Sequence, residues 1–484
     1  MIDSIKLKWF YGLVFGFIAL GCYCLVKEFY WLAALPVVLA ILYMAVFAID
    51  ALLFIVVVTT PLAINLEDSG FGISLSVPTE PLMFGIMVLF LLKIIFEGGF
   101  DKKVLYHPVT IMILFNLAWL FITCLTSTMI VVSLKHVMAR LWFVISFYFL
   151  GTQLFRDYKN IKRFVWLYTI PLLIVIAYTV IRHAGFGFTE KTAHWVMTPF
   201  YNDHTAYAAA IAMFLPIMIG LSRNKQYSLN NRLAALFVCI IFVGAIVLSY
   251  TRAAWVSLAV ALVVYFIFAL RIRFTTVLIG MVGLVIFFFA FKTQITMKLE
   301  KNRQRSSTDL NTHLQSISNI TTDASNLERI NRWNSAMRMF REKPFFGWGP
   351  GTYQFQYAPF QHSNEMTIIS TNAGDRGNSH SEYIGPLAET GVLGAVTFIL
   401  IVIAVIYRGT MLYIRSKDKE IRFITLGILL GLITYFVHGA MNNFLDTDKA
   451  SVPFWGFVAI LVALDVYHSK QQTEAIQNGN GRHK

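Results

Sequence analysis

Apolar residues gather along this chain into many long runs, which short polar segments separate. Runs of roughly 18 to 22 apolar residues match the length that an α-helix needs to cross the hydrocarbon core of a bilayer. We therefore expect about fourteen transmembrane helices, and twelve stays open because the first three runs have very short connections. In chain order the runs span roughly 9–26, 29–48, 51–65, 80–97, 108–125, 137–154, 163–182, 206–221, 233–250, 253–270, 274–292, 386–407, 422–440 and 451–467.

Composition narrows the fold class further. Of the 484 residues, 57% are hydrophobic and only 14% are charged, whereas soluble domains carry about 25% charged residues. The first apolar run follows Lys6 and Lys8 and lacks a small-residue cleavage site, so we expect a transmembrane helix and not a removed signal peptide. The predicted fold class is an all-α integral membrane protein, a polytopic helical bundle of about 12 to 14 spans.

Lys and Arg residues are concentrated in every second connection. Because cytoplasmic loops of membrane proteins carry an excess of these residues, we place both chain termini in the cytoplasm. Topology and inner-leaflet anchoring then account for the net charge of +14, and no nucleic-acid partner is needed. The segments assigned to the cytoplasm are Lys102–Lys103, Arg156–Arg163, Arg223–Arg232, Arg271–Arg273, Arg408–Arg422 and the tail.

This reading divides the chain into four parts. Residues 1–292 hold about eleven spans, residues 293–385 form one large loop on the outer, periplasmic side, residues 386–467 hold three spans, and residues 468–484 are a cytoplasmic tail. Loops of this length are usually functional or disordered. Arg305–Asn326 is rich in Ser, Thr and Asn, and we expect it to be irregular.

The rest of the loop is patterned. Ser325 and Glu328 have the spacing of a capping box, and Pro344 ends the helix that would follow. Residues 345–353, "FFGWGPGTY", have no preceding strand and no final lysine, so we expect a tight turn at the membrane surface and not a phosphate-binding loop. The apolar positions of the amphipathic helix are Leu327, Ile330, Trp333, Met337 and Phe340.

Arginines near the outer surface are the first candidate site residues. Arg252 lies in a tight turn between two apolar runs, where a charge is expensive and should have a partner; snorkelling at a helix end is the alternative. Arg329 and Arg332 are three residues apart on the loop helix and can converge on one anion. Guanidinium groups bind phosphate or pyrophosphate bidentately and keep their charge. Arg140 is a weaker candidate of the same kind.

His380 is the candidate general base. "Ser379-His-Ser-Glu382" repeats the capping-box spacing, which predicts that His380 lies in the first turn of a short helix. A helix N-terminus and nearby arginines disfavour the imidazolium form, and a neutral imidazole can accept a proton near pH 7. The alternative is a histidine that only forms hydrogen bonds at the interface.

Other polar residues on the same side are candidates for substrate contact. Asn202 and His204 precede one apolar run, although helix capping by Asn202 or Asp203 is the simpler interpretation. His438 lies with Asn442, Asn443 and Asp446 at the outer end of the thirteenth run. No cluster has metal-ligand spacing, and the four cysteines suggest neither a metal site nor a disulfide framework.

Taken together, "SYTRAAW", "ERINRWNSAMRMFREKPFFGWGPGTY" and "NSHSEYIGPLAETGVLG", with a large outer loop before the last three spans, resemble the bacterial O-antigen ligase and O-antigen polymerase family. The resemblance covers mainly residues 195–465. Two positions depart from the family's pattern: Thr251 stands where Ser is frequent, and Ser381 where Asn is frequent.

The resemblance implies the C-type glycosyltransferase architecture. It also implies transfer of glycan from a polyprenyl-pyrophosphate (undecaprenyl) carrier to an acceptor outside the inner membrane, as in lipopolysaccharide biosynthesis, without cofactor or metal. Carried over by position, the family's tight-turn arginine is Arg252, its loop-helix arginine is Arg329, four residues before Trp333, and its catalytic histidine is His380. Trp333 and Ser381 thereby join the candidate substrate-binding residues.

We therefore expect inverting glycosyl transfer, with the arginines holding the leaving diphosphate and His380 accepting the acceptor's proton. A ligase acting on lipid A-core or another acceptor and a polymerase of repeat units both fit the sequence. A glycolipid transporter or flippase is the alternative of another class; it predicts repeated halves and broken helices, and the sequence has no clear internal repeat.

Overall fold

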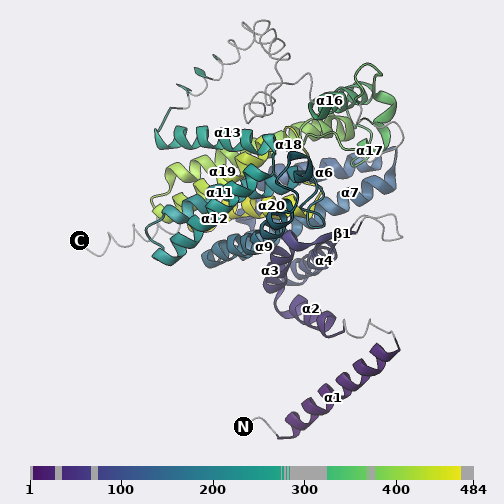
Figure 1. Ribbon diagram of the computed structural model, residues 1–484, viewed down its shortest axis with the longest axis vertical. Coiled ribbons are helices and arrows are strands. Elements are labelled where there is room, and N and C mark those ends of the chain that lie inside the picture. Colours follow the sequence, from purple (N-terminus) through teal and green to yellow (C-terminus); the bar gives the residue numbers. More distant parts are fainter. Residues whose placement is uncertain are drawn as a thin grey trace, which may run out of the picture. The chain divides into compact units, whose positions relative to one another are not determined.

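The computed structural model describes residues 4–27, 35–66, 75–273, 275–276, 279–280, 283, 324–367, 370 and 377–469 (Figure 1). The chain divides into two compact units, Met1–Ile55 and Val56–Lys484. The first unit contains α1 (Ser4–Val26), α2 (Leu35–Phe47) and the beginning of α3 (Ile49–Thr59). All candidate site residues belong to the second unit.

Ten helices in the described part of the chain are long and apolar enough to cross a membrane, which confirms a polytopic all-α membrane protein. They are α4 (Thr79–Glu97), α6 (Pro108–Leu125), α7 with its π turn and α8 (Ile130–Leu154), α9 (Tyr158–Ala184), α11 (His204–Arg223), α12 (Leu229–Leu248), α13 (Arg252–Ala269), α18 (Gly385–Arg415), α19 (Lys419–His438) and α20 with its π turn (Asp448–His468). Most of the predicted run 274–292 lies outside the described residues.

The predicted third run is shorter than expected. Helix α3 has 11 residues and is followed by a 3-10 turn, Thr60–Leu62, that contains Pro61. Because proline lacks the backbone N–H that a helix interior needs, the chain leaves the helix here and forms strand β1 (Ile64–Leu66). This strand pairs antiparallel with β2 (Leu75–Val77), in a register that places Ile64 opposite Val77.

Helices α11 and α19 approach closely and form the centre of the bundle (Figure 1). A side chain at Gly431 would overlap the carbonyl oxygen of Met213, and one at Gly427 would lie 2.8 Å from the Cα of Ile217. Small residues allow two helix backbones to approach in this way. The packing fixes the C-terminal end of α19 beside the N-terminal end of α11, where several site residues lie.

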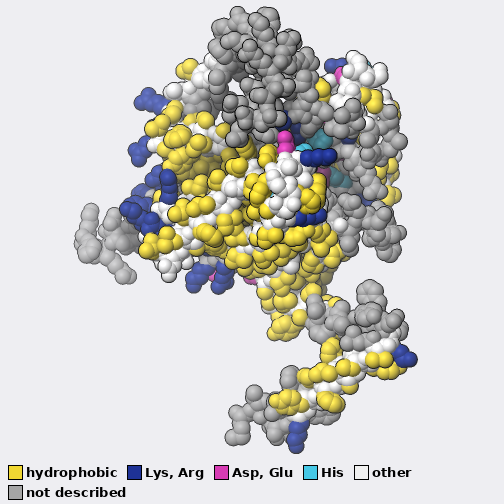
Figure 2. Space-filling view, in the orientation of Figure 1, with side chains coloured by type: hydrophobic (Ala, Val, Ile, Leu, Met, Phe, Trp, Pro, Cys, Tyr) yellow, Lys and Arg dark blue, Asp and Glu magenta, His cyan; other side chains and the backbone are white. Residues whose placement is uncertain are grey.

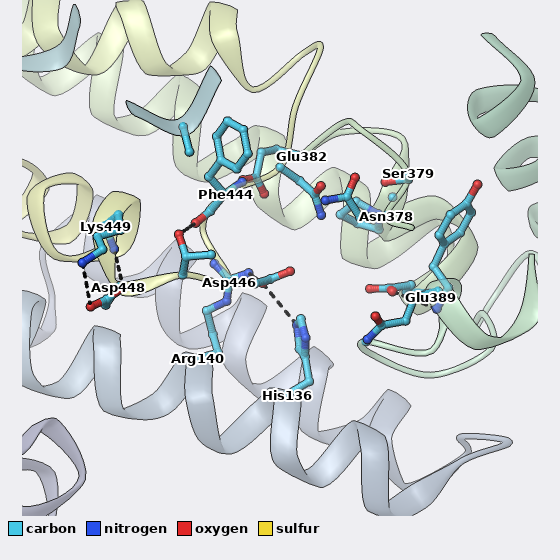
Figure 3. A pocket seen from close by; sticks show the side chains of 18 of the residues that line it. His136, Arg140, Asn378, Ser379, Glu382, Glu389, Phe444, Asp446, Asp448 and Lys449 are labelled. Atoms are coloured by element: carbon cyan, nitrogen blue, oxygen red, sulfur yellow. Dashed lines mark hydrogen bonds and ion pairs between the residues drawn. The ribbon is translucent and has the colours of Figure 1, made fainter. Parts of the chain in front are cut away.

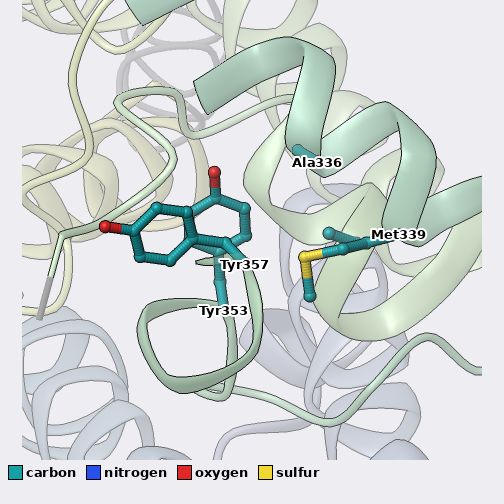
Figure 4. Packing of buried hydrophobic residues seen from close by; sticks show 5 residues of the cluster. Ala336, Met339, Tyr353 and Tyr357 are labelled. Carbon is teal, nitrogen blue, oxygen red and sulfur yellow. The ribbon is translucent and has the colours of Figure 1, made fainter. Parts of the chain in front are cut away.

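The described part of the loop packs around helix α16 (Ala324–Glu342), which confirms the predicted amphipathic helix. A short helix, α17 (Tyr353–Gln356), and a 3-10 turn, η5 (Ala358–Phe360), follow it. The stacked rings of Tyr353 and Tyr357 lie beside Ala336 and Met339 of α16 (Figure 4). The buried cluster comprises Ala336, Met339, Tyr353, Tyr357 and Ala388, so it joins the loop to α18.

The capping box predicted at the start of this helix is wrong. Ser325 lies inside α16 and not before it. The carboxylate of Glu328 instead accepts hydrogen bonds from Arg332 Nε at 2.7 Å, from Thr367 Oγ1 at 3.0 Å and from the Ser370 hydroxyl. The capping box would have the Glu328 carboxylate accept from a backbone amide at the start of the helix. It accepts instead from side chains of its own helix and of the later loop.

The glycine-rich segment is a tight turn, as expected, and it docks on a kink in α18. Gly347 and Gly349 have positive φ, and the amide of Gly349 donates to the Glu389 carbonyl at 2.8 Å. Gly391 has φ 70° and ψ −170° inside α18, and a Cβ there would overlap the carbonyl oxygen of Phe345. Glycine is required at these positions by backbone conformation and by close contact.

Lys and Arg side chains gather at the end of the second unit that lies away from α16, on the left in Figure 2, while hydrophobic side chains cover most of the visible helix surface. An apolar belt beside a basic end is the pattern that the predicted membrane orientation requires.

Candidate functional site

The site forms where the ends of four helices meet the segment that precedes α18. The amide of Glu382 donates to the Gly439 carbonyl at 2.8 Å, and the Tyr383 hydroxyl donates to the Phe436 carbonyl at 2.9 Å. These bonds hold residues 377–384 against the C-terminal end of α19. Arg329 of α16 reaches the turn after α19, and the turn before α13 bonds to the first turn of α11.

His380 is not on a helix, so the second predicted capping box is also wrong. Residues 377–381 are irregular, a turn follows, and α18 begins at Gly385. His380 has φ 51°, a left-handed conformation that is uncommon for residues other than glycine, and its amide donates to Asn378 Oδ1 at 3.0 Å. The Ser381 hydroxyl, in turn, accepts from the amides of Tyr383 and Ile384 at 3.3 Å.

The physical reason for this difference is the environment of Glu382. Its Oε1 accepts from the amides of Phe444 and Leu445, at 2.8 and 2.9 Å, and from the Tyr435 hydroxyl at 2.7 Å. The carboxylate therefore accepts hydrogen bonds from backbone amides in the turn after α19 and is not available to cap its own segment. Burial and the charge of Asp446 raise the pKa of Glu382 to about 7.

His380 is a neutral imidazole at physiological pH. Burial and the positive charges of Arg329 and Arg332 lower the pKa of His380 to about 4. The charges of Asp203 and Glu328 oppose this shift but are smaller in effect. The predicted influence of the arginines is thus present, whereas burial is the larger cause.

Contacts within the chain fix the position of the Arg332 side chain. The guanidinium pairs with Glu328 and lies 4.2 Å from the ring centroid of Tyr357. It also occupies the space that a side chain at Gly377 would fill, directly before the histidine segment. Its buried Nη1 has no hydrogen-bond partner among the described residues. The Nη1 group of Arg332 is therefore a hydrogen-bond donor without an acceptor among the described residues.

Arg329 lies one helical turn before Trp333 and contacts the turn after α19. Its Nε donates to the carbonyl oxygen of Met441 at 3.3 Å. Trp333, for its part, has a buried indole N–H without a hydrogen-bond partner in the described part of the chain. The structure thus brings Arg329 and Arg332 to His380, as the sequence predicted.

Arg252 opens α13 directly after a three-residue turn, which confirms the predicted tight connection. Helix α12 ends at Leu248, Tyr250 has φ 51°, and the Thr251 hydroxyl donates to the carbonyl oxygen of His204 at 3.3 Å. This bond joins the turn that carries Arg252 to the first turn of α11. An arginine at that junction lies at a helix N-terminus, where the dipole also favours anions.

The predicted capping of α11 is carried by Asp203 and not by Asn202. Asp203 Oδ1 accepts from the Thr205 amide at 2.9 Å and lies 2.9 Å from His204 Nδ1. Although burial acts to raise it, the hydrogen bonds from His204 and Thr205 lower the pKa of Asp203 well below its usual range. His204 also lies over His194, with ring centroids 4.1 Å apart.

His438 is buried and not open to solvent. Its Nε2 lies 3.2 Å from Asn442 Nδ2, and its Nδ1 has no partner among the described residues. The ring therefore packs against the turn after α19, and no contact among the described residues indicates that it binds substrate.

A cavity of about 640 Å³ adjoins the His380 segment (Figure 3). Among the predicted site residues, only Arg140, Asn202 and Ser381 line it. Arg140 Nη2 lies 2.9 Å from Asp446 Oδ1, and His136 Nε2 lies 3.8 Å from the same oxygen. The arginines of the histidine cluster and the cavity are thus two adjoining regions and not one pocket.

Sequence reasoning missed several of these residues. Glu328 precedes Arg332 by four residues, a spacing that predicts the observed ion pair. Asn378 and Glu389 lie within the quoted motif around His380 but were not assigned a role, and His136 reaches the site only through the packing of α7.

A family model described as O-antigen ligase matches residues 235–399. These residues belong to the O-antigen ligase family. The match contains His380 with its neighbours Arg329 and Arg332, and it also contains Arg252. An uncharacterized protein of Haemophilus influenzae is 20% identical over 402 residues, which are 80% of this chain and 95% of the relative.

The match over residues 235–399 supports a role in glycan transfer in general, with lipid-linked glycans as the class of substrate. The ten apolar helices agree with this class.

Proposed function

We propose that this protein is a glycosyltransferase that moves glycan from a polyprenyl-pyrophosphate carrier to an acceptor hydroxyl at the periplasmic face of the bacterial inner membrane. The observation that carries the proposal is the position of His380, a neutral imidazole beside the guanidinium groups of Arg329 and Arg332. The hydrogen bond of His380 to Asn378 Oδ1 is made by its backbone amide, so we assign the ring to the acceptor.

The arginines are assigned to the donor. Arg252, Arg329 and the Nη1 group of Arg332 bind the diphosphate while the polyprenyl tail lies among the helices. Guanidinium groups suit this role because they stabilise the charge that grows on the diphosphate as it leaves.

The proton transfer is assigned to His380. The acceptor hydroxyl gives its proton to the imidazole as its oxygen attacks the anomeric carbon. The bond from that carbon to the diphosphate oxygen breaks, and the carrier diphosphate leaves with the electron pair. Attack opposite the leaving group inverts the anomeric centre. The imidazolium then releases the proton to solvent, which regenerates the neutral base. A general base of this kind typically accelerates a reaction by about 10² to 10⁴.

Cationic side chains supply the charge that a divalent ion supplies in other diphosphate reactions. We therefore expect transfer to proceed without cofactor or added metal.

The acceptor decides between ligase and polymerase. We favour a ligase, which moves the glycan to lipid A-core or another acceptor, because the family model carries that description. A strain that lacks the gene should then accumulate unattached long chains. Retention of single repeats with loss of long chains would instead indicate a repeat-unit polymerase.

The direct test is reconstitution. Purified protein in detergent should convert carrier-linked glycan, extracted from the deletion strain, into acceptor-linked product and free carrier diphosphate. Activity should persist after prolonged EDTA treatment. A protein that moves the glycolipid across vesicle membranes without forming product is a flippase or transporter, and that result would refute the proposal.

A further inference from the structure

We propose that the 640 Å³ cavity beside the histidine segment binds the sugar end of the acceptor, which is neutral and rich in hydroxyl groups, and does not bind the donor's diphosphate. This inference rests on the proposed glycan transfer and adds where the second substrate sits.

Charge in the cavity lining argues against a diphosphate. Among the described residues, the lysine and arginine side chains in the lining are Arg140 and Lys449, and both are engaged. Arg140 pairs with Asp446, while Lys449 Nζ donates to the Ala63 carbonyl at 2.7 Å and also to Thr60. The carboxylates in the lining are Glu80, Asp203, Glu382, Glu389, Asp446 and Asp448. A diphosphate would find both cations of the described lining already paired, whereas hydroxyl groups would find carboxylate and amide acceptors.

Asp446 is the carboxylate best placed to bind such a ligand. Its Oδ1 is fixed by Arg140 and His136, yet 44% of its side chain is exposed, and Oδ2 makes no hydrogen bond within the described chain (Figure 3). Glu382 and Glu389, in contrast, are occupied by backbone amides of Leu445 and Tyr353. A carboxylate that is oriented by a cation and still open on one side is a built hydrogen-bond acceptor.

Amide and aromatic groups complete the lining. Asn202 is exposed at the cavity edge, and Asn443 keeps a buried amide oxygen without a partner among the described residues. Tyr353, Phe200 and Trp455 contribute aromatic surface. Small-ligand sites have this character, with apolar and aromatic walls, a few convergent polar groups and volumes of about 300 to 1,000 Å³.

The cavity is also correctly placed for the reaction. Ser379 and Ser381, on either side of His380, form part of its wall. Asp203 lines it too, and the charge of Asp203 acts on the His380 ring. A sugar held in the cavity would therefore present a hydroxyl toward the base, while the arginines of α13 and α16 hold the donor.

The test separates the two substrates by their KM values. Asp446→Asn removes the charge and keeps the size, and Asn202→Ala removes an exposed amide. Each variant should raise KM for the glycolipid acceptor by about tenfold and leave KM for the carrier-linked donor unchanged. Both substrates are extracted from the deletion strain. The control is Asp418→Asn, which caps α19 at its opposite end, where asparagine caps as well as aspartate.

A rise in donor KM, or no change in acceptor KM for both variants, would overturn the proposal. Melting temperatures of the purified variants show whether Asp446→Asn still folds, and the exposed Asn202 site provides the result if it does not. Failure of the unmodified protein to transfer glycan would instead refute the proposed function itself, before any variant is compared.

Discussion

His380 owes its chemical character to burial and to its two arginine neighbours. A solvated histidine is partly protonated at neutral pH, with a pKa near 6.5, and a protonated ring cannot accept a proton. The left-handed backbone at His380, fixed by Asn378, holds the ring in this environment. Strained backbone of this kind is frequent at functional sites.

The first prediction concerns this titration. Because the pKa of His380 is lowered to about 4, the ring should stay neutral from pH 8 down to about 5 and become protonated only as the pH falls through about 4. Histidine-selective ¹⁵N NMR of the purified protein should show this, with the signal assigned by its loss in His380→Gln. A midpoint near 6.5 for that signal would contradict the assigned environment.

At the residue scale, sequence reasoning identified Arg329, Arg332 and His380 as neighbours but did not distinguish the two arginines. The Arg332 guanidinium forms an ion pair with Glu328 of its own helix and a cation–π contact with Tyr357, which follows α17. The alternative that Asp203 acts as a helix cap is correct, while its electrostatic effect on His380 depends on tertiary packing.

At the element scale, backbone hydrogen bonds join the glycine-rich turn to the kink in α18, so the two form one structural unit. The amide of Val392 donates to the Pro344 carbonyl at 2.9 Å, and the amide of Trp348 donates to Ala388 at 3.0 Å. These bonds satisfy backbone groups that the kink frees from the helix ladder. The loop is thereby fixed to the helix that follows the histidine.

The second prediction tests this structural unit. Gly391→Ala would place a Cβ on the Phe345 carbonyl at a positive φ, so it should lower the melting temperature and reduce transfer; overpacking of this kind costs about 1 to 3 kcal/mol. The matched control is Gly244→Ala in α12, where no atom lies within 4 Å of the new Cβ and alanine favours the helix. Equal melting temperatures for the two variants would contradict the role of Gly391.

Most element boundaries followed from the sequence, because apolar runs and prolines act locally. The loop helix ends at Glu342, shortly before Pro344, as predicted. The two capping boxes failed for a tertiary reason: Glu328 and Glu382 have stronger partners in distant segments. Spacing alone does not reveal such competition.

At the scale of the whole molecule, composition was sufficient to predict a polytopic helical membrane protein, and ten described helices confirm it. The cavity and its Arg140–Asp446 pair were not predictable as a unit, because α7 and the turn after α19 are about 300 residues apart in sequence.

The third prediction concerns orientation. We place the loop that contains α16 in the periplasm and the connection between α18 and α19 in the cytoplasm, since the latter is rich in Lys and Arg. In a cysteine-free background, Ser363→Cys should react with a membrane-impermeant maleimide in intact spheroplasts, and Lys417→Cys only after permeabilisation. The reverse pattern would place the site on the cytoplasmic side.

The central claim is that cationic residues bind the donor diphosphate while His380 performs the proton transfer. Single-turnover rates, measured against carrier-linked glycan concentration, separate the two roles. His380→Ala should lower the maximal rate by about 10² to 10⁴ with unchanged donor affinity, whereas Arg252→Ala and Arg329→Ala should weaken donor affinity. Near-normal rates in His380→Ala, or unaltered donor affinity in both arginine variants, would contradict the account.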